Sequence, residues 1–241
     1  MTRRLPHRLN LCYASKMDGH ATHWAIFDFS SLSDEALKHA YLKTTEDTAL
    51  PQPQRIRSAA RSHWAGRIVL KHLLESQKIK DSIQVNAEFG YPFTHQCHVS
   101  IAHTEKVAVA AISNAPVGID LEKKTRPVRA VLEKLVTTEE LDRFHSGRWV
   151  DTHGIVEPEL YLWVGKEAVM KASGLGLSGG LKRVHIQWNQ GAPFPIVQDL
   201  SGPLPLKNPQ LHFFSVGDCV IAICYQTTEL NAQPIRVAIE D

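Results

Sequence analysis

Hydrophobic and polar residues along the chain follow two periods, one of two residues and one near four. Alternation with a period of two in residues 23–29 predicts a strand, and residues 31–42 have the pattern of a helix with Ser33 as its N-terminal cap. A longer helix is expected from Gln54 to about Gln77, because apolar residues recur there at every fourth position while arginine and lysine occupy the other faces.

Short apolar runs in the middle of the chain indicate further strands. Residues 107–113 and 117–122 are separated by Asn114 and Pro116, an arrangement typical of a β-hairpin. A helix is then expected to begin near Pro127.

The second half of the chain contains further helices and strands. Thr137 can cap a helix, and Glu140 can reach back to the cap as in a capping box. Another helix is expected from about Glu159 to Ser173, ended by Gly174. The remaining strand-like runs are residues 184–188, 211–216, 219–226 and 235–240.

Composition narrows the class of protein. The 241 residues are 43% hydrophobic, which is enough for one sizeable core or two smaller ones. The 27 Lys plus Arg against 25 Asp plus Glu argue against nucleic-acid binding through the charge of the whole protein. No apolar run reaches the ~18 residues of a membrane span, so a cytoplasmic protein is expected. The cysteines form no Cys-x-x-Cys pair and are expected to be reduced, mostly buried thiols.

Two carboxylates are placed together by the run Val117-Gly-Ile-Asp-Leu-Glu122. The period of a strand points Asp120 and Glu122 to the same side, where a hard cation such as Mg²⁺ would offset their repulsion. Gly118 would let a ligand approach the backbone. The same pattern also occurs at solvated strand edges, where charge prevents aggregation, and both interpretations stay open on this motif alone.

A second group of charged residues lies on the helix expected at 159–173. Trp163, Glu167 and Lys171 are four residues apart and share one face, and Lys166 is adjacent in sequence. On an isolated helix, Glu167 and Lys171 would form a surface ion pair worth only ~0.2–0.5 kcal/mol. The apolar residues around them favour a helix that packs against another element and lines a cleft.

These two motifs, in this order, resemble the signature of the 4′-phosphopantetheinyl transferases. The family has Val/Ile-Gly-Ile/Val-Asp-x-Glu and then Trp/Phe-x-x-Lys-Glu-x-x-x-Lys, which stand here as residues 117–122 and 163–171. The resemblance covers roughly residues 54–185 and is closest to the longer, surfactin-type members. Those members also carry Arg-x-x-aromatic-x-Ala-Gly-Arg, which matches residues 61–67 here, and Ser/Thr-x-x-Glu, which matches residues 137–140.

Two family motifs are altered in this sequence. Gly-Lys-Pro is replaced by Gly90-Tyr91-Pro92, and Ser-His-Ser is replaced by Ala102-His103-Thr104. Two polar contacts expected for coenzyme A are therefore missing or come from other residues, and Tyr91 is included among the residues expected near coenzyme A.

The resemblance implies an α+β fold of two similar halves related by a pseudo-twofold axis. Each half would be a small antiparallel sheet packed on a long helix, with the active site in the cleft between them. The expected halves are residues 1–114, which would contact the adenosine and 3′-phosphate of coenzyme A, and residues 115–241, which would carry the metal site and the catalytic helix.

The resemblance also implies the activity. The family transfers the 4′-phosphopantetheine group of coenzyme A to a serine of an apo acyl or peptidyl carrier protein and releases 3′,5′-ADP. Such enzymes serve fatty-acid, polyketide or nonribosomal peptide synthesis, and the pathway served here is open. Mg²⁺, with Mn²⁺ as an alternative, is the expected metal. A monomer is expected, with no membrane and no nucleic acid among its partners.

Residue roles follow from the same resemblance. The expected metal ligands are Asp120, Glu122 and Glu167. Glu167 is the first candidate for the base that takes the serine proton, and Glu140 is the second. The expected roles of the cationic and imidazole groups are stabilisation of the departing phosphate by Lys171, phosphate contact by Lys166, and recognition of the 3′-phosphate by Arg61 and His103.

Three alternatives stay open. One is another Mg²⁺-dependent phosphate enzyme, although the sequence lacks the glycine-rich phosphate loops Gly-x-x-x-x-Gly-Lys-Ser/Thr and Gly-x-Gly-x-x-Gly. The second is a non-catalytic nucleic-acid binder that uses the arginines of residues 55–71. The third is a catalytically degenerate relative that binds carrier proteins without turnover.

Overall fold

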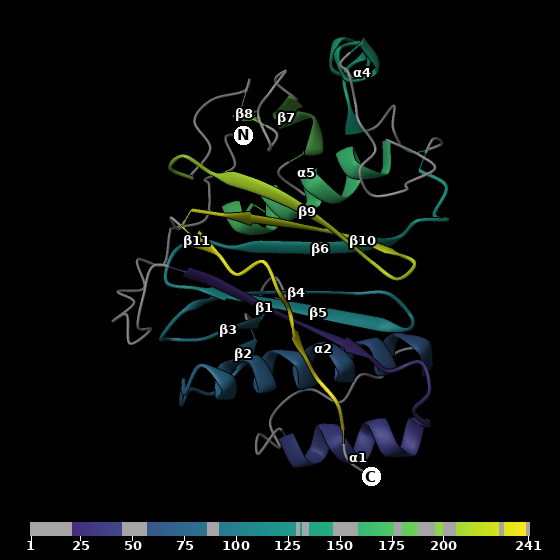
Figure 1. Cartoon of the computed structure of the whole chain (residues 1–241), viewed down its shortest axis with the longest axis vertical. Coiled ribbons are helices and arrows are strands. Elements are labelled where there is room, and N and C mark those ends of the chain that lie inside the picture. The colour runs from purple at the N-terminus through teal and green to yellow at the C-terminus, as the bar shows by residue number, and fades with distance from the viewer. Residues whose placement is uncertain are drawn as a thin grey trace, which may run out of the picture.

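The protein is described by a computed structural model. The described residues are 21–44, 57–85, 92–128, 131, 135–146, 159–175, 180–187, 196–199, 206–226 and 229–239. In this part of the chain, a long helix, two sheets and a second long helix lie one upon another, and a shorter helix packs on the outer side of the first (Figure 1). The fold is mixed α+β, as expected from the sequence.

The first sheet is built on β1 (Ala21–Asp28). Strand β5 (Val107–Ser113) pairs antiparallel with β1 and with β4 (His98–His103), and these three strands form the body of the sheet. Near the C-terminus, β11 (Glu229–Leu230) and β12 (Ile235–Arg236) return to pair parallel with β1. The strand predicted at residues 23–29 is confirmed, whereas the run at 235–240 contributes only the two residues of β12.

One long helix covers the outer face of this sheet, and a shorter helix packs against that helix (Figure 1). Helix α1 (Asp34–Thr44) begins after Ser33, whose hydroxyl accepts a hydrogen bond from the amide of Ala36 at 3.1 Å, so the predicted cap is confirmed. Helix α2 (Arg57–Ser76) is the long helix expected from the four-residue period. Its apolar side packs on β1 and β5 in a buried core that includes Ile68, Leu73 and Phe27.

The second sheet has the order β6–β10–β9. Strand β10 (Cys219–Tyr225) is central and pairs antiparallel with β6 (Gly118–Lys123) and β9 (Gln210–Val216). Helix α5 (Glu159–Ser173) packs on its outer face and ends, as predicted, at Gly174, whose φ of 69° lies in the left-handed region that favours glycine.

The predicted hairpin between residues 107–113 and 117–122 is wrong. Strands β5 and β6 belong to different sheets, and the residues between them cross from one sheet to the other. The two sheets face one another through a common core, to which β5 contributes Val109 and Ala111 while β6 contributes Ile119 and Leu121. Both strands place apolar side chains in the core between the sheets, and the spacing of these residues along the chain does not reveal that the strands belong to different sheets.

Smaller elements complete the described structure. Strand β2 (Gln84–Val85) pairs with β3 (Pro92–Phe93), and β7 (Val184–Gln187) pairs with β8 (Ile196–Asp199). Helix α4 (Thr138–Ser146) is confirmed, and the short helix η2 (Leu181–Arg183) precedes β7. Of the helix expected near Pro127, most lies outside the described residues.

Each sheet therefore carries a long helix on its outer face, which agrees with the expected sheet-and-helix units. The boundary after residue 114 stays a prediction, and residues 229–239 extend the second half back onto β1. Cys97, Cys219 and Cys224 are buried free thiols, as predicted. In the described ranges, no helix is both long and apolar enough to span a bilayer.

Candidate active site

The alternation along β6 decides which side chains face α5. Ile119 and Leu121 point into the core between the sheets, so Asp120 and Glu122 lie on the opposite face, toward α5. Asp120 is buried, whereas Glu122 is partly exposed. The sequence pattern thus correctly predicted that these two carboxylates share one side of a strand.

Close contact between β6 and α5 depends on Gly118. A Cβ atom at this position would lie 2.0 Å from the carbonyl oxygen of Ala168 and 2.5 Å from the amide nitrogen of Ala172. The space expected for a ligand is therefore occupied by the backbone of α5. The absent side chain lets the helix approach the strand and brings Glu167 and Lys171 beside Asp120.

Lys171 links three segments through its ammonium group. Its Nζ donates to Asp120 Oδ1 at 2.8 Å, to the carbonyl oxygen of Ile119 at 3.0 Å and to that of Ile101 at 3.3 Å. Three acceptors match the three N–H donors of a lysine. A phosphate bound by Lys171 would therefore have to replace one of these acceptors.

Glu167 lies close enough to Asp120 for the two charges to interact. The pKa of Glu167 is raised to about 7, mainly by burial and then by the negative charge of Asp120, while Lys171 and Arg126 oppose the shift. Burial also raises the pKa of Asp120, against the opposing effect of Lys171. Two carboxyl groups from distant parts of the chain thus share one volume, and one of them holds its proton near neutral pH.

Arg126 is a functional candidate that the sequence analysis missed. Its guanidinium forms an ion pair with Glu122 and lies over the ring of Trp163, 4.7 Å from the ring centre. The only sequence signal is its position four residues after Glu122, which is too common to indicate a site. In this arrangement, Arg126 is the cation nearest to the carboxylate of Glu122.

The donor set of this region suits a hard divalent cation. Asp120 and Glu167 offer carboxylate oxygens, which Mg²⁺ and Mn²⁺ prefer, and the negative charge of Asp120 adds to burial in raising the pKa of Glu167. No group of three ligating side chains is arranged as a metal site among the residues described. Glu122, the expected third ligand, is turned to Arg126 instead.

Lys166 and Glu140 form a separate, fully buried pair. Lys166 is 0% exposed, and its Nζ donates to Glu140 Oε2 at 2.6 Å and to the carbonyl oxygens of Leu135 and Leu181. The other oxygen of Glu140 accepts from the amide of Ile186 at 3.1 Å. Burial lowers the pKa of Lys166, and the charge of Glu140 opposes this shift.

This geometry corrects three expectations. Lys166 has no open path to a phosphate, and Glu140 is held away from Asp120 and Glu167, so neither contacts the carboxylate pair. Thr137 does cap α4, accepting the amide of Glu140 at 3.2 Å. The carboxylate of Glu140 does not complete a capping box, because both of its oxygens are bonded elsewhere.

Arg61 is also engaged within the fold. Its guanidinium forms an ion pair with Asp34 and donates to the carbonyl oxygens of Phe29, at 3.2 Å, and Leu32, at 2.9 Å. These contacts tie α2 to the segment that leads into α1. A 3′-phosphate would have to compete with the carboxylate of Asp34 for Arg61. In this structure, Arg61 therefore connects two parts of the fold.

Arg67 lies one to two turns further along α2 and has a different environment. It is 6% exposed, and its Nε has no hydrogen-bond partner in the described part of the chain. His103, at the end of β4, is near enough that Arg67 and Lys171 both help burial to lower its pKa. Burial, Arg67 and His103 together lower the pKa of His63 to about 4. The region is rich in cationic and imidazole groups.

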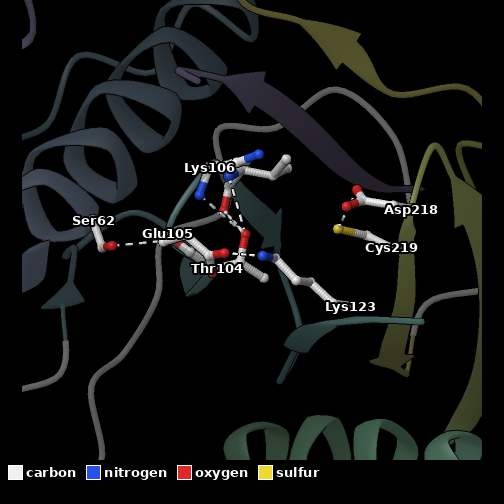
Figure 2. A network of polar contacts seen from close by, with 8 residues as sticks. Ser62, Thr104, Glu105, Lys106, Lys123, Asp218 and Cys219 are labelled. Carbon is white, nitrogen blue, oxygen red and sulfur yellow. Dashed lines mark hydrogen bonds and ion pairs between the residues drawn. The ribbon is translucent and has the colours of Figure 1, made fainter. Parts of the chain in front are cut away.

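A cleft of about 550 Å³ opens beside these groups. Its lining residues, from α2, the β4–β5 turn, β6 and the segment after it, are Ser62, His103, Thr104, Glu105, Glu122, Lys123, Thr125 and Arg126. Figure 2 shows the rim, where an ion pair joins Lys123 to Glu105 and the hydroxyl of Ser62 donates to the carbonyl oxygen of Thr104 at 3.1 Å. Tyr91 lies outside the described residues.

Comparison with known proteins gives the same family as the sequence motifs. The sequence profile of the 4′-phosphopantetheinyl transferase superfamily matches residues 116–224, which include β6, α5 and β10. The chain is similar to 4′-phosphopantetheinyl transferase gsp of Aneurinibacillus migulanus, with 27% identity over 65% of this chain and 66% of that protein. It is also similar to 4′-phosphopantetheinyl transferase psf-1 of Bacillus pumilus, with 28% identity over 51% of this chain and 54% of that protein. The matched region thus spans less than two thirds of either relative.

Residues 116–224 of this chain thus resemble the 4′-phosphopantetheinyl transferase superfamily.

Proposed function

We propose that this protein transfers the 4′-phosphopantetheine group of coenzyme A to a serine of an apo acyl or peptidyl carrier protein and releases 3′,5′-ADP. The observation that carries the proposal is the placement of Glu167 beside Asp120, where burial and then the charge of Asp120 raise the pKa of Glu167 to about 7. Both residues belong to the two family motifs, and two facing carboxylates of this kind suit a metal-assisted reaction at a pyrophosphate.

Asp120 and Glu167 would hold Mg²⁺ or Mn²⁺, and Glu122 would join them if it left Arg126. The bound metal would offset the negative charge that develops on the pyrophosphate. Glu167 would also accept the proton of the serine hydroxyl at a carboxylate oxygen, directly or through water, because a pKa near neutrality suits a general base. The serine oxygen then forms a bond to the β-phosphorus, and the bond from that phosphorus to 3′,5′-ADP breaks.

The cationic residues would stabilise the negative product. Lys171 lies against Asp120 at 2.8 Å and could exchange one of its carbonyl acceptors for an oxygen of the departing phosphate. Arg67 replaces Arg61, alongside His103, in our assignment of the 3′-phosphate contact. Arg67 has an unpaired Nε near the cleft, whereas Arg61 is bonded to Asp34.

A direct test is to incubate the protein with coenzyme A, Mg²⁺ and several apo-carrier proteins and then to measure the intact mass of each carrier. The expected result is a gain equal to one phosphopantetheine group on at least one carrier, and loss of that gain in EDTA. Asp120→Ala is the matched control for contaminating activity, because it removes one proposed ligand. No gain on any carrier, or full transfer in EDTA, would contradict the proposal.

Two other functions give different results in the same experiment. A catalytically degenerate relative would bind an apo-carrier without changing its mass. A nucleic-acid binder would show steep salt-dependent binding to DNA or RNA and no transfer. The second alternative is not favoured, because the family motifs supply a carboxylate pair rather than a basic surface.

A further inference from the structure

The edges of the two sheets meet at β4 and β6 without a backbone ladder between them. Among the described strands, β6 pairs only with β10, and β4 pairs only with β5. Two side chains make the connection instead. The hydroxyl of Ser100, on β4, accepts the amide hydrogen of Ile119 at 3.0 Å, and Lys171 donates to the carbonyl oxygens of Ile101 and Ile119.

Both backbone groups of Ile119 on the outer edge of β6 are therefore bonded by side chains. Ser100 takes the N–H group and Lys171 takes the C=O group. Ile119 is 0% exposed and Ser100 is 6% exposed, so water does not readily replace either partner. The residue fixed in this way directly precedes Asp120 in the chain.

The contacts of Ser100 and Lys171 also join the two sheets at their facing edges. Ser100 and Ile101 come from the sheet that carries α2, whereas Ile119 and Asp120 come from the sheet that carries α5. His103, at the cleft, lies on the same strand as Ser100. The contact of Ser100 with Ile119 therefore joins the strand that carries His103 to the strand that carries Asp120.

We infer that Ser100 is a positioning residue, which fixes the strand edge beneath Asp120 and thereby sets the carboxylate pair against the cationic side of the cleft. The inference rests on the proposed function for its effect on turnover, but the contact itself is independent of that function. Ser100 is bonded to the backbone amide of Ile119, so its effect is exerted through Ile119.

Ser113 offers a matched control in the same sheet. It is also buried, and its hydroxyl accepts from the backbone amide of Ala115 at 3.2 Å and from Thr22 at 3.2 Å. Ser113→Ala removes a buried acceptor as Ser100→Ala does, but it leaves the β4–β6 contact in place. Ser100→Cys keeps nearly the same side-chain volume with a weaker hydrogen-bond acceptor. It can therefore take the place of Ser100→Ala in the test if that variant fails to fold.

The first measurement is hydrogen–deuterium exchange of the full-length protein without substrate. We expect the amide of Ile119 to exchange about tenfold faster in Ser100→Ala, with a smaller increase in Ser100→Cys, because a neutral hydrogen bond contributes about that factor. Ser113→Ala should leave this amide unchanged. Parent-like exchange at Ile119 in both Ser100 variants would overturn the inference.

The second measurement is steady-state transfer to a carrier that the parent modifies. We expect Ser100→Ala to lower kcat by about tenfold or more while KM for coenzyme A changes less, since the contacts that bind coenzyme A are kept. Ser100→Thr, which restores the hydroxyl, should regain part of kcat. Equal losses in Ser100→Ala and Ser113→Ala would make Ser100 a stability residue only. If the parent modifies no carrier, the proposed function fails while the exchange result still stands.

Discussion

The backbone of Gly118 lies so close to the carbonyl group of Ala168 that a Cβ atom on Gly118 would be 2.0 Å from the carbonyl oxygen. Gly118 lies in strand β6 and Ala168 lies in helix α5, so neither backbone can move alone. The candidate site thus depends on the spacing of one strand and one helix.

Replacing Gly118 with alanine should destabilise the protein strongly. Overpacking typically costs about 1–3 kcal/mol, and we expect at least about 3 kcal/mol here, because α5 as a whole must shift. Urea unfolding measures the difference. The control is Gly174→Ala, where nothing lies within 4 Å and only the φ of 69° opposes a side chain; it should cost roughly 1–2 kcal/mol. A Gly118→Ala protein as stable as Gly174→Ala would contradict this account.

Metal affinity should depend on pH through Glu167. Its raised pKa of about 7 means that a proton occupies the carboxyl group below that pH, so a divalent cation must displace it. The dissociation constant for Mg²⁺ should rise by about tenfold for each pH unit below 7. Isothermal titration calorimetry in buffers of different ionisation enthalpy would measure both the affinity and the released proton. In Glu167→Gln this dependence should disappear along with most of the affinity, whereas a flat affinity in the parent would argue against the assignment.

Arg67 and Arg61 should respond differently to a change in the ligand. Arg67→Ala is expected to raise KM for coenzyme A by roughly ten- to a hundredfold and to leave KM for dephospho-coenzyme A almost unchanged, since only coenzyme A has the 3′-phosphate. Arg61→Ala should reduce stability and affect both substrates equally, because it removes the bond to Asp34. The opposite result for the two variants would restore Arg61 as the phosphate contact.

The buried ion pair of Lys166 with Glu140 should stabilise the folded protein. Lys166→Met leaves the carboxylate of Glu140 buried without its cation, and breaking such a pair costs about 3–5 kcal/mol. Lys166→Met combined with Glu140→Gln should be more stable than Lys166→Met alone, because glutamine is neutral and can still accept the amide of Ile186. Thermal unfolding of the single and double variants measures this coupling. A folded, stable Lys166→Met protein without transfer activity would instead indicate a direct role in the reaction.

His98 should make the free energy of unfolding sensitive to acid. Burial lowers its pKa to about 4, whereas an unfolded histidine titrates near 6.5, so the unfolded state binds more protons between these values. The free energy of unfolding should therefore fall as pH is lowered from about 6.5 to 4. His98→Gln should reduce this slope relative to the parent in urea unfolding at several pH values, and an unchanged slope would show that other groups dominate.

The sequence by itself determined the elements and the two carboxylate-bearing motifs. The four-residue period and Gly174 give α5 as observed, Glu159–Ser173, and the two-residue period places Asp120 and Glu122 on one side of β6. These predictions succeed because they depend on neighbours in the chain, whose geometry is fixed by the backbone of a helix or a strand.

Only the tertiary structure decided how these elements combine. Strands β5 and β6, expected as a hairpin, lie in facing sheets whose apolar inner faces pack against each other. Glu167 and Lys166 are adjacent in sequence, yet Glu167 faces Asp120 while Lys166 is buried against Glu140. Whether a charged side chain contacts a ligand or another part of the fold depends on which distant segment packs against it, and a one-dimensional pattern carries no such information.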